Sequence, residues 1–200
     1  MKKTTFWLWT MAPNAMESDG FWLEYDQSKS NIEFWKLLDV EPIESSGNTV
    51  TYNLEGNKWK EIEKYEVLPV HLSLPVVGDR LKKEIENLPV SKQIDFFPVV
   101  VMHSSGAVFY KWLLRPLVAQ GCIDFDDSKI LSWIVPDKVV FYYESLRFLP
   151  NCLGTNQVAR NAHITSQIIV STSFKKIVEK YNTGNFTFLQ DFEIPPLTMS

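Results

Sequence analysis

Short stretches of alternating apolar and polar residues recur along the chain, and this alternation predicts half-buried β-strands. In residues 49–54, for example, Val50, Tyr52 and Leu54 alternate with polar neighbours. An apolar run at 93–102 is followed by Ser104-Ser105-Gly106 and a returning run at 107–114, which is typical of a β-hairpin. The predicted strands cover residues 4–11, 20–25, 49–54, 93–102, 107–114, 139–143, 167–170 and 186–189.

Other segments have apolar residues at helical spacing. Asp79 is a candidate N-cap for a helix that Pro89 ends, and its apolar face comprises Leu81, Ile85 and Leu88. Ser171 or Thr172 caps a second helix, which Thr183-Gly184-Asn185 ends and whose apolar face comprises Phe174, Ile177, Val178 and Tyr181. Ser30 is a candidate cap for a short helix over residues 31–38, and residues 61–67 fit either a strand or a short helix.

The two longer helical segments superpose with an offset of 93 residues. The offset places Val77 on Val170, Leu81 on Phe174, Lys82-Lys83 on Lys175-Lys176 and Glu86 on Glu179. An aromatic strand follows each helix. Two interpretations are open: the chain contains two copies of a strand–helix–strand unit, or short basic amphipathic helices coincide by chance.

Strands interspersed with a few short helices predict an α+β protein with a mixed, mainly antiparallel sheet and two strand–helix–strand units. Residues 1–66 form an acidic, β-rich N-terminal part, and residues 67–200 form a C-terminal α+β part. We expect the two parts to pack as one compact unit, because 200 residues suit one domain or two small ones.

Composition and charge narrow the class of protein. Hydrophobic residues make up 45% of the chain, enough to exclude disorder as the dominant state. The net charge is −4, and residues 1–100 carry 11 basic and 16 acidic side chains, so we expect no nucleic-acid partner. No apolar stretch reaches the length of a membrane span and no signal peptide is evident, so we expect no membrane association and a cytoplasmic location. The sequence predicts no oligomeric state.

The two cysteines, Cys122 and Cys152, could form one disulfide. Their spacing matches no disulfide framework, so we expect reduced, partly buried thiols.

Motifs for cofactors and metals are missing from the sequence. His71, His103 and His163 are far apart, and no zinc, phosphate-loop or nucleophile-elbow spacing occurs, so we expect no metal and no cofactor. Asp124-x-Asp126-Asp127 is the densest acidic cluster, but it lacks the glycine and the closing glutamate of a calcium loop. It fits a capped turn or a surface for protein recognition.

A second acidic group surrounds the aromatic residues Phe21, Trp22 and Tyr25, and it comprises Glu17, Asp19, Glu24 and Asp26. Paired carboxylates beside aromatic rings occur in sugar hydrolases. They also occur as a charged rim around aromatic anchors in protein interfaces. Arg115, Arg147 and Arg160 are not clustered in the sequence, so they predict no nucleic-acid stripe.

From about Leu74 onward the order of segments resembles the immunity proteins of bacterial polymorphic toxin systems, the group of the Myxococcus-type immunity domain and its relatives. The residues that carry the resemblance are Gly78-Asp79-Arg80-Leu81-Lys82, Ile94-Asp95-Phe96-Phe97-Pro98-Val99, Ile123-Asp124-Phe125-Asp126-Asp127-Ser128, Leu146-Arg147-Phe148, Ile169-Val170-Ser171-Thr172-Ser173-Phe174-Lys175 and Gly184-Asn185-Phe186-Thr187-Phe188. Gly78 stands where these chains usually have serine.

The resemblance implies a protein without enzymatic activity that binds the C-terminal domain of a cognate toxin and blocks its active site. Aromatic anchors and acidic groups suit such an interface, and the candidate toxin-binding residues are Trp22, Glu24, Asp124, Asp126 and Asp127. Two alternatives stay open: a small carbohydrate- or small-molecule-active enzyme that uses the N-terminal carboxylates, and an adaptor for an unrelated protein.

Overall fold

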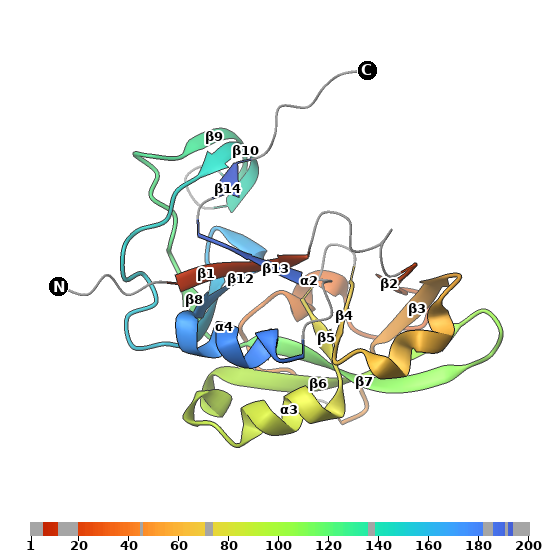
Figure 1. The fold of residues 1–200 in the computed structure, drawn as a ribbon. Helices are drawn as coiled ribbons and strands as arrows, with labels where there is room; N and C mark the ends of the chain where they lie inside the picture. Colours follow the sequence, from red (N-terminus) through yellow and green to blue (C-terminus); the bar gives the residue numbers. More distant parts are fainter. Residues whose placement is uncertain are drawn as a thin grey trace.

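Figure 1 shows the fold in a computed structural model of the chain. The structure describes residues 6–11, 20–44, 46–70, 74–135, 139–181, 186–190 and 192–193. Across this described part the strands form three sheets, and the helices are short, with eight residues each in α3 (Asp79–Glu86) and α4 (Thr172–Glu179). The predicted α+β class with mixed, mainly antiparallel sheets is confirmed.

The first sheet has six strands in the order β2-β3-β6-β7-β5-β4. Their bounds are β2 Phe21–Tyr25, β3 Thr51–Gly56, β4 Val67–Leu68, β5 Val76–Val77, β6 Ile94–His103 and β7 Val108–Pro116. β3 and β6 run parallel, and the other neighbours run antiparallel. Just after β4, Val70 bridges Leu23 of β2, and the Leu23 amide donates to the Pro69 carbonyl at 2.9 Å. The sheet therefore curls until its two edges meet at residues 67–70.

The predicted hairpin is confirmed as β6 and β7, which pair from Ile94 opposite Pro116 to Met102 opposite Val108. In the turn, the amide of His103 donates to the carbonyl of Ala107 at 2.9 Å. Gly106 has a φ of 87°, a left-handed conformation that side chains disfavour.

The second sheet has five strands in the order β13-β1-β12-β11-β8, and a three-stranded sheet has the order β14-β10-β9. Their bounds are β1 Phe6–Met11, β8 Ala119–Gln120, β9 Lys129–Val135, β10 Val139–Leu146, β11 Val158–Asn161, β12 Ile164–Ser171, β13 Phe186–Leu189 and β14 Phe192–Glu193. A large core contains buried residues from the six-stranded sheet, from the five-stranded sheet and from both longer helices. Strands of residues 1–66 pair with strands of residues 67–200, as β1 does with β12 and β3 does with β6.

The internal repeat that the sequence suggests is present in the structure. In the first copy, α3 connects β5 to β6, and both strands flank β7. In the second copy, α4 connects β12 to β13, and both strands flank β1, which comes from the start of the chain. The registers correspond, because Val77 lies opposite Trp112 and Val170 lies opposite Trp7.

Equivalent side chains make equivalent contacts in the two copies. In the first, the Lys82 ammonium lies 4.3 Å from the centre of the Trp112 ring, and it pairs with Glu86 at 2.6 Å. The Trp112 indole donates to Asp79 at 2.7 Å. In the second, Lys175 lies 4.1 Å from the centre of the Trp7 ring and pairs with Glu179 at 2.8 Å, while the Trp7 indole donates to Thr172 at 3.2 Å. Both lysine side chains are 18% exposed. Agreement at this level of detail favours an internal repeat over a chance coincidence of two basic helices.

A polar contact joins the two copies. Lys180 and Tyr181, which follow α4, each donate to the Glu84 carboxylate of α3 at 2.6 Å. The hydrogen bonds from Lys180 and Tyr181 lower the pKa of Glu84. The bond between Tyr181 and Glu84 also raises the pKa of the Tyr181 hydroxyl. The carboxylate is therefore held in its charged form between the repeats.

The caps of the two longer helices match the predictions only in part. The N-cap of α3 is Gly78 rather than Asp79, and the carboxylate of the distant Glu66 accepts from the amides of Arg80 and Leu81. Ser171, one of the two candidates, caps α4 through a bond from the amide of Phe174 at 3.2 Å. The predicted end of that helix at residues 183–185 lies outside the described residues.

The helix predicted over residues 31–38 is reduced to the single turn α2 (Phe34–Leu37), and Ser30 does not cap it. The reason is tertiary: the Thr49 amide donates to the Asn31 side chain at 2.7 Å, and the Thr51 amide donates to Ser30 at 2.9 Å. These bonds hold the segment extended beside the start of β3. Of the two structures open for residues 61–67, most of the segment takes a short 3-10 helix, η1 (Trp59–Lys64), followed by β4.

Candidate functional site

Trp22 and Glu24 project from the same side of β2, because side chains two residues apart share one face of a strand. Phe21 and Leu23 of this strand are buried, whereas Trp22 is half-buried and Glu24 is exposed. The Trp22 indole donates to the Glu24 carboxylate at 3.0 Å. The pair forms a small aromatic and acidic surface at this strand.

Asp124, Asp126 and Asp127 lie in the turn that precedes β9. The Asp124 carboxylate accepts hydrogen bonds from the amides of Asp126 and Asp127 at 3.2 and 3.3 Å. The Asp124 amide donates to the backbone carbonyl of Arg147 at 2.8 Å. Asp124 therefore holds the turn, as the capping interpretation predicts. Asp126 and Asp127 are exposed and are free to meet a partner's charges.

The structure does not bring these two groups of candidate residues together. In Figure 1, β2 lies at the right of the view, whereas β8 and β9, which flank the Asp124 turn, lie at the left. A partner that contacts both groups would have to span much of the molecule. Their role in toxin binding stays a prediction.

The N-terminal carboxylates of the enzyme alternative are described only in part, because Glu17 and Asp19 lie outside the described residues. Asp26 accepts hydrogen bonds from Ser28 and Lys29, and these bonds hold the pKa of its carboxyl well below the usual range. A carboxylate held in its charged form in this way is a poor general acid.

Sequence reasoning missed an arginine pair. Arg115 and Arg160 are separate in the sequence, but both are buried and both donate to the carbonyl of Leu37, at 3.3 and 2.9 Å. Arg115 also forms an ion pair with Asp95 at 2.7 Å. The two arginines are far apart in the sequence, and β7 and β11 bring them together at the end of α2. No sequence signal marks them, because isolated arginines usually lie on the surface.

A pocket of about 310 Å³ opens beside this pair. Its apolar walls are formed by Trp35, Leu38, Val40, Ala119 and Ala162, with Asp39, Thr165 and Arg160 as the polar residues. Trp35 is 67% exposed. The pocket therefore combines an exposed aromatic ring with a buried cation.

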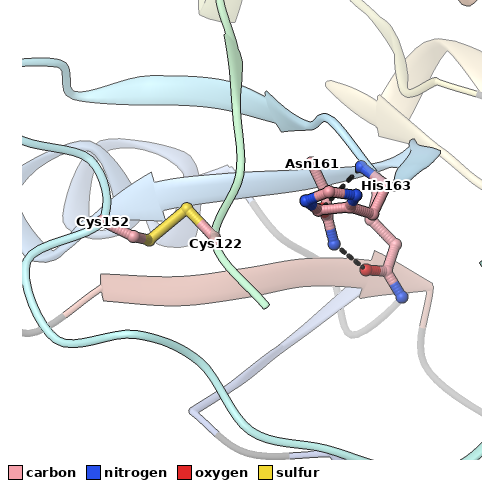
Figure 2. Close-up of a disulfide and its surroundings, with 5 residues drawn as sticks. Cys122, Cys152, Asn161 and His163 are labelled. Carbon is pink, nitrogen blue, oxygen red and sulfur yellow. Dashed lines mark hydrogen bonds between the residues drawn. A yellow bond between two sulfur atoms is a disulfide. The ribbon is translucent and has the colours of Figure 1, made fainter. Parts of the chain in front are cut away.

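Cys122 and Cys152 form a disulfide, which corrects the expectation of reduced thiols. Figure 2 shows this bond together with Asn161 and His163. The pairing has a tertiary cause: Ile123 bridges Phe148, and the Leu149 amide donates to the Cys122 carbonyl at 2.8 Å. These contacts lay the two segments side by side and bring the Cα atoms of the cysteines to 5.1 Å.

The imidazole of His163 packs edge-on against Phe125, with ring centres 4.8 Å apart, and the His163 amide donates to the buried Asn161 side chain at 3.1 Å. The structure thus gives His163 a packing role beside the disulfide. Within the described ranges, no three His, Cys, Asp or Glu side chains gather in a way that could hold a metal ion. Over the same ranges, no helix is long and apolar enough to cross a membrane.

Taken together, the fold and its surfaces define an α+β protein whose candidate sites suit recognition of another molecule. The chain belongs to the immunity protein family Imm11, whose family model matches residues 46–191. This match confirms the resemblance to bacterial immunity proteins and extends it toward the N-terminus from Leu74. No curated protein matches the chain.

Proposed function

We propose that this immunity protein binds and neutralises a cognate toxin, and that its target is the C-terminal domain of a polymorphic toxin, whose active site it covers. Membership of the immunity family is the observation that carries the proposal. The protein acts by binding and has no catalytic activity of its own.

The site of action in this proposal is the cytoplasm, where the protein meets a toxin delivered by neighbouring cells. The Cys122–Cys152 disulfide bears on this location, because the cytoplasm normally keeps thiols reduced. Quantifying free thiols in protein that is alkylated during cell lysis tests this point. An alkylated pair agrees with a cytoplasmic location, and a protected disulfide argues for an oxidising compartment.

Two surfaces are candidates for the contact: the Trp22–Glu24 pair, and the exposed Asp126 and Asp127. Aromatic anchors supply most of the affinity in protein interfaces, and acidic groups accelerate association with a basic partner. A residue central to the interface costs about 2 kcal/mol or more when cut back to alanine, which is roughly 30-fold in affinity.

The deciding experiment is co-expression with the C-terminal domain of the protein encoded immediately upstream. We expect the domain to stop growth, and we expect this chain to restore growth and to co-purify with the domain. A non-toxic neighbour, or toxicity with neither rescue nor binding, contradicts the proposal for that pair. Binding to a non-toxic partner favours the adaptor alternative.

Two double variants then locate the contact: Trp22→Ala with Glu24→Ala, and Asp126→Ala with Asp127→Ala. The two pairs lie on separate elements, and the variants remove one and two negative charges, respectively. We expect at least one variant to lose roughly 30-fold in affinity. Small losses that merely follow the number of charges removed indicate a general charge effect and place the interface elsewhere. Asp124 is tested separately as Asp124→Asn, because its side chain also holds the turn.

A further inference from the structure

The pocket beside the arginine pair is built from separate parts of the chain. Trp35 and Leu38 come from α2 and its end, Ala119 comes from β8, and Thr165 comes from β12. Its volume of about 310 Å³ is at the small end of ligand sites, which run from roughly 300 to 1,000 Å³. It is large enough for one side chain and its immediate neighbours.

The charged group of this pocket is Arg160, whose side chain is 1% exposed. Its Nε donates to the Pro116 carbonyl at 3.1 Å and its Nη2 donates to the Leu37 carbonyl at 2.9 Å. Its Nη1 has no hydrogen-bond acceptor among the residues that the structure describes. A buried donor without an acceptor is uncommon in proteins, and it indicates a place for a missing partner.

The surroundings of Arg160 favour an anion. Arg115 has its own carboxylate, Asp95, whereas the salt bridges of the described residues give Arg160 none. Asp39 is the acidic residue on the pocket wall, and its carboxylate accepts from the amide of Val40 at 2.7 Å. Burial and the neighbouring Arg115 charge lower the pKa of Arg160, and attraction to Asp39 opposes them. A second carboxylate would compensate the buried charge further.

We infer that this pocket receives an acidic side chain, glutamate or aspartate, that the bound toxin domain presents. The inference rests on the proposed function and names one anchoring contact of it. Nη1 of Arg160 has almost no exposed surface, so the carboxylate accepts a hydrogen bond from it only once the pocket wall shifts on binding. The apolar stem of the side chain packs against Leu38, Ala119 and Ala162. Trp35 contacts the surface around the inserted residue, and tryptophan and arginine are both enriched at binding hot spots.

The chemistry of the pocket is tested without the toxin. The probe is glutamate with both backbone ends capped, N-acetyl-glutamate N-methylamide, and the control is the same compound made from glutamine. Both are titrated into the ¹⁵N-labelled protein, and Trp35→Phe assigns the indole signal of Trp35. We expect the glutamate compound to shift the Trp35 indole and Arg160 Nε signals in a saturable way, and the glutamine compound to leave them in place. Equal shifts, or none, overturn the inference.

A matched pair of variants tests whether the carboxylate comes from the toxin. Both change Thr165, an exposed residue on the pocket wall. Thr165→Glu places a competing carboxylate at the pocket, and Thr165→Gln is the neutral control. We expect Thr165→Glu to abolish the shifts caused by the capped glutamate and to weaken toxin binding tenfold or more, while Thr165→Gln behaves as the wild type. Urea unfolding verifies that both variants fold.

The outcomes separate the two proposals. If capped glutamate binds but the toxin binds Thr165→Glu at wild-type affinity, the pocket serves a free carboxylate, and the assignment to the partner is overturned while immunity stands. If the toxin does not bind the wild-type chain, the proposed function is wrong, and so is the assignment of the pocket to a toxin side chain. The capped compounds then still decide whether the pocket prefers a carboxylate.

Discussion

The cap of α3 gives the sharpest test of how this fold is held together. Glu66 is nearly buried, and one oxygen of its carboxylate accepts from the amides of Arg80 and Leu81, both at 3.0 Å. The other oxygen accepts from the Arg80 guanidinium at 2.8 Å. The carboxylate thus does for the first turn of the helix what an N-cap side chain normally does.

The magnitude follows from the groups that would be left without partners. Loss of an N-cap costs about 1–2 kcal/mol, and a hydrogen bond to a charged group contributes about 1.5–3 kcal/mol. Glu66→Ala leaves these two amides without their acceptor, so we expect it to lower the free energy of unfolding by about 3 kcal/mol. Glu66→Gln keeps one acceptor oxygen and loses the charge, so we expect about half that loss.

Arg80→Ala is the matched control, because it removes the ion pair and leaves the cap intact. The Arg80 side chain is 68% exposed, and an exposed ion pair contributes about 0.2–1 kcal/mol. Urea unfolding followed by tryptophan fluorescence, with the slope against urea compared across variants, measures all three losses. If Arg80→Ala costs as much as Glu66→Ala, the ion pair and not the cap is responsible, and the reasoning fails.

A double-mutant cycle with Gly78 tests the geometry of the cap. A Cβ at Gly78 would lie 2.5 Å from the Glu66 carboxylate, so Gly78→Ala must displace the cap. We expect Gly78→Ala to destabilise the wild-type protein and to have little effect in the Glu66→Ala background. Additive losses would show that the two residues do not interact.

Three further predictions concern the repeat and the disulfide. Lys82→Met and Lys175→Met each remove a cation–π contact and an ion pair four residues along a helix, so each should lower the free energy of unfolding by about 1 kcal/mol; unequal losses in urea unfolding would contradict the equivalence of the two copies. Reducing the disulfide, which joins residues 30 apart in the sequence, should cost about 3–4 kcal/mol by the loop-entropy relation, as measured by unfolding with and without reductant. The pKa of the Glu84 carboxylate is lowered in the folded protein. Its stabilising effect is therefore complete above its unfolded-state pKa of about 4.3 and is lost as the pH falls through its folded-state pKa. The difference in stability between the wild type and Glu84→Gln should shrink below about pH 4, and a difference that does not change with pH would exclude the linkage.

Local patterns in the sequence predict most of the elements of this fold. The alternation in residues 49–54 and the turn at 104–106 need only near neighbours to act, and β3 and the β6–β7 hairpin form where they indicate. The correspondence between α3 and α4 at an offset of 93 residues also agrees with the structure, because Leu81 and Phe174 are buried at equivalent positions of the two helices.

Features that depend on distant parts of the chain could not be predicted in this way. Glu66 caps a helix from outside its own segment, and the cysteines pair because Ile123 and Phe148 lie side by side. Arg115 and Arg160 meet only because both reach the carbonyl of Leu37. Each of these contacts follows from the way strands are ordered in the sheets, which residue spacing does not encode.

The repeat also changes how the aromatic content of the chain relates to binding. With 27 aromatic residues in its composition, the sequence suggests many possible anchors for a partner, yet the structure commits several of them to the fold. Trp7 and Trp112 lie beneath lysines in the two repeats, and the indole of Trp22 is bonded to Glu24. Trp35, by contrast, is 67% exposed and stands beside a buried arginine with an unused donor. If aromatic residues anchor the toxin, Trp35 is therefore a stronger candidate than Trp22, and Trp35→Ala should cost more affinity than Trp22→Ala.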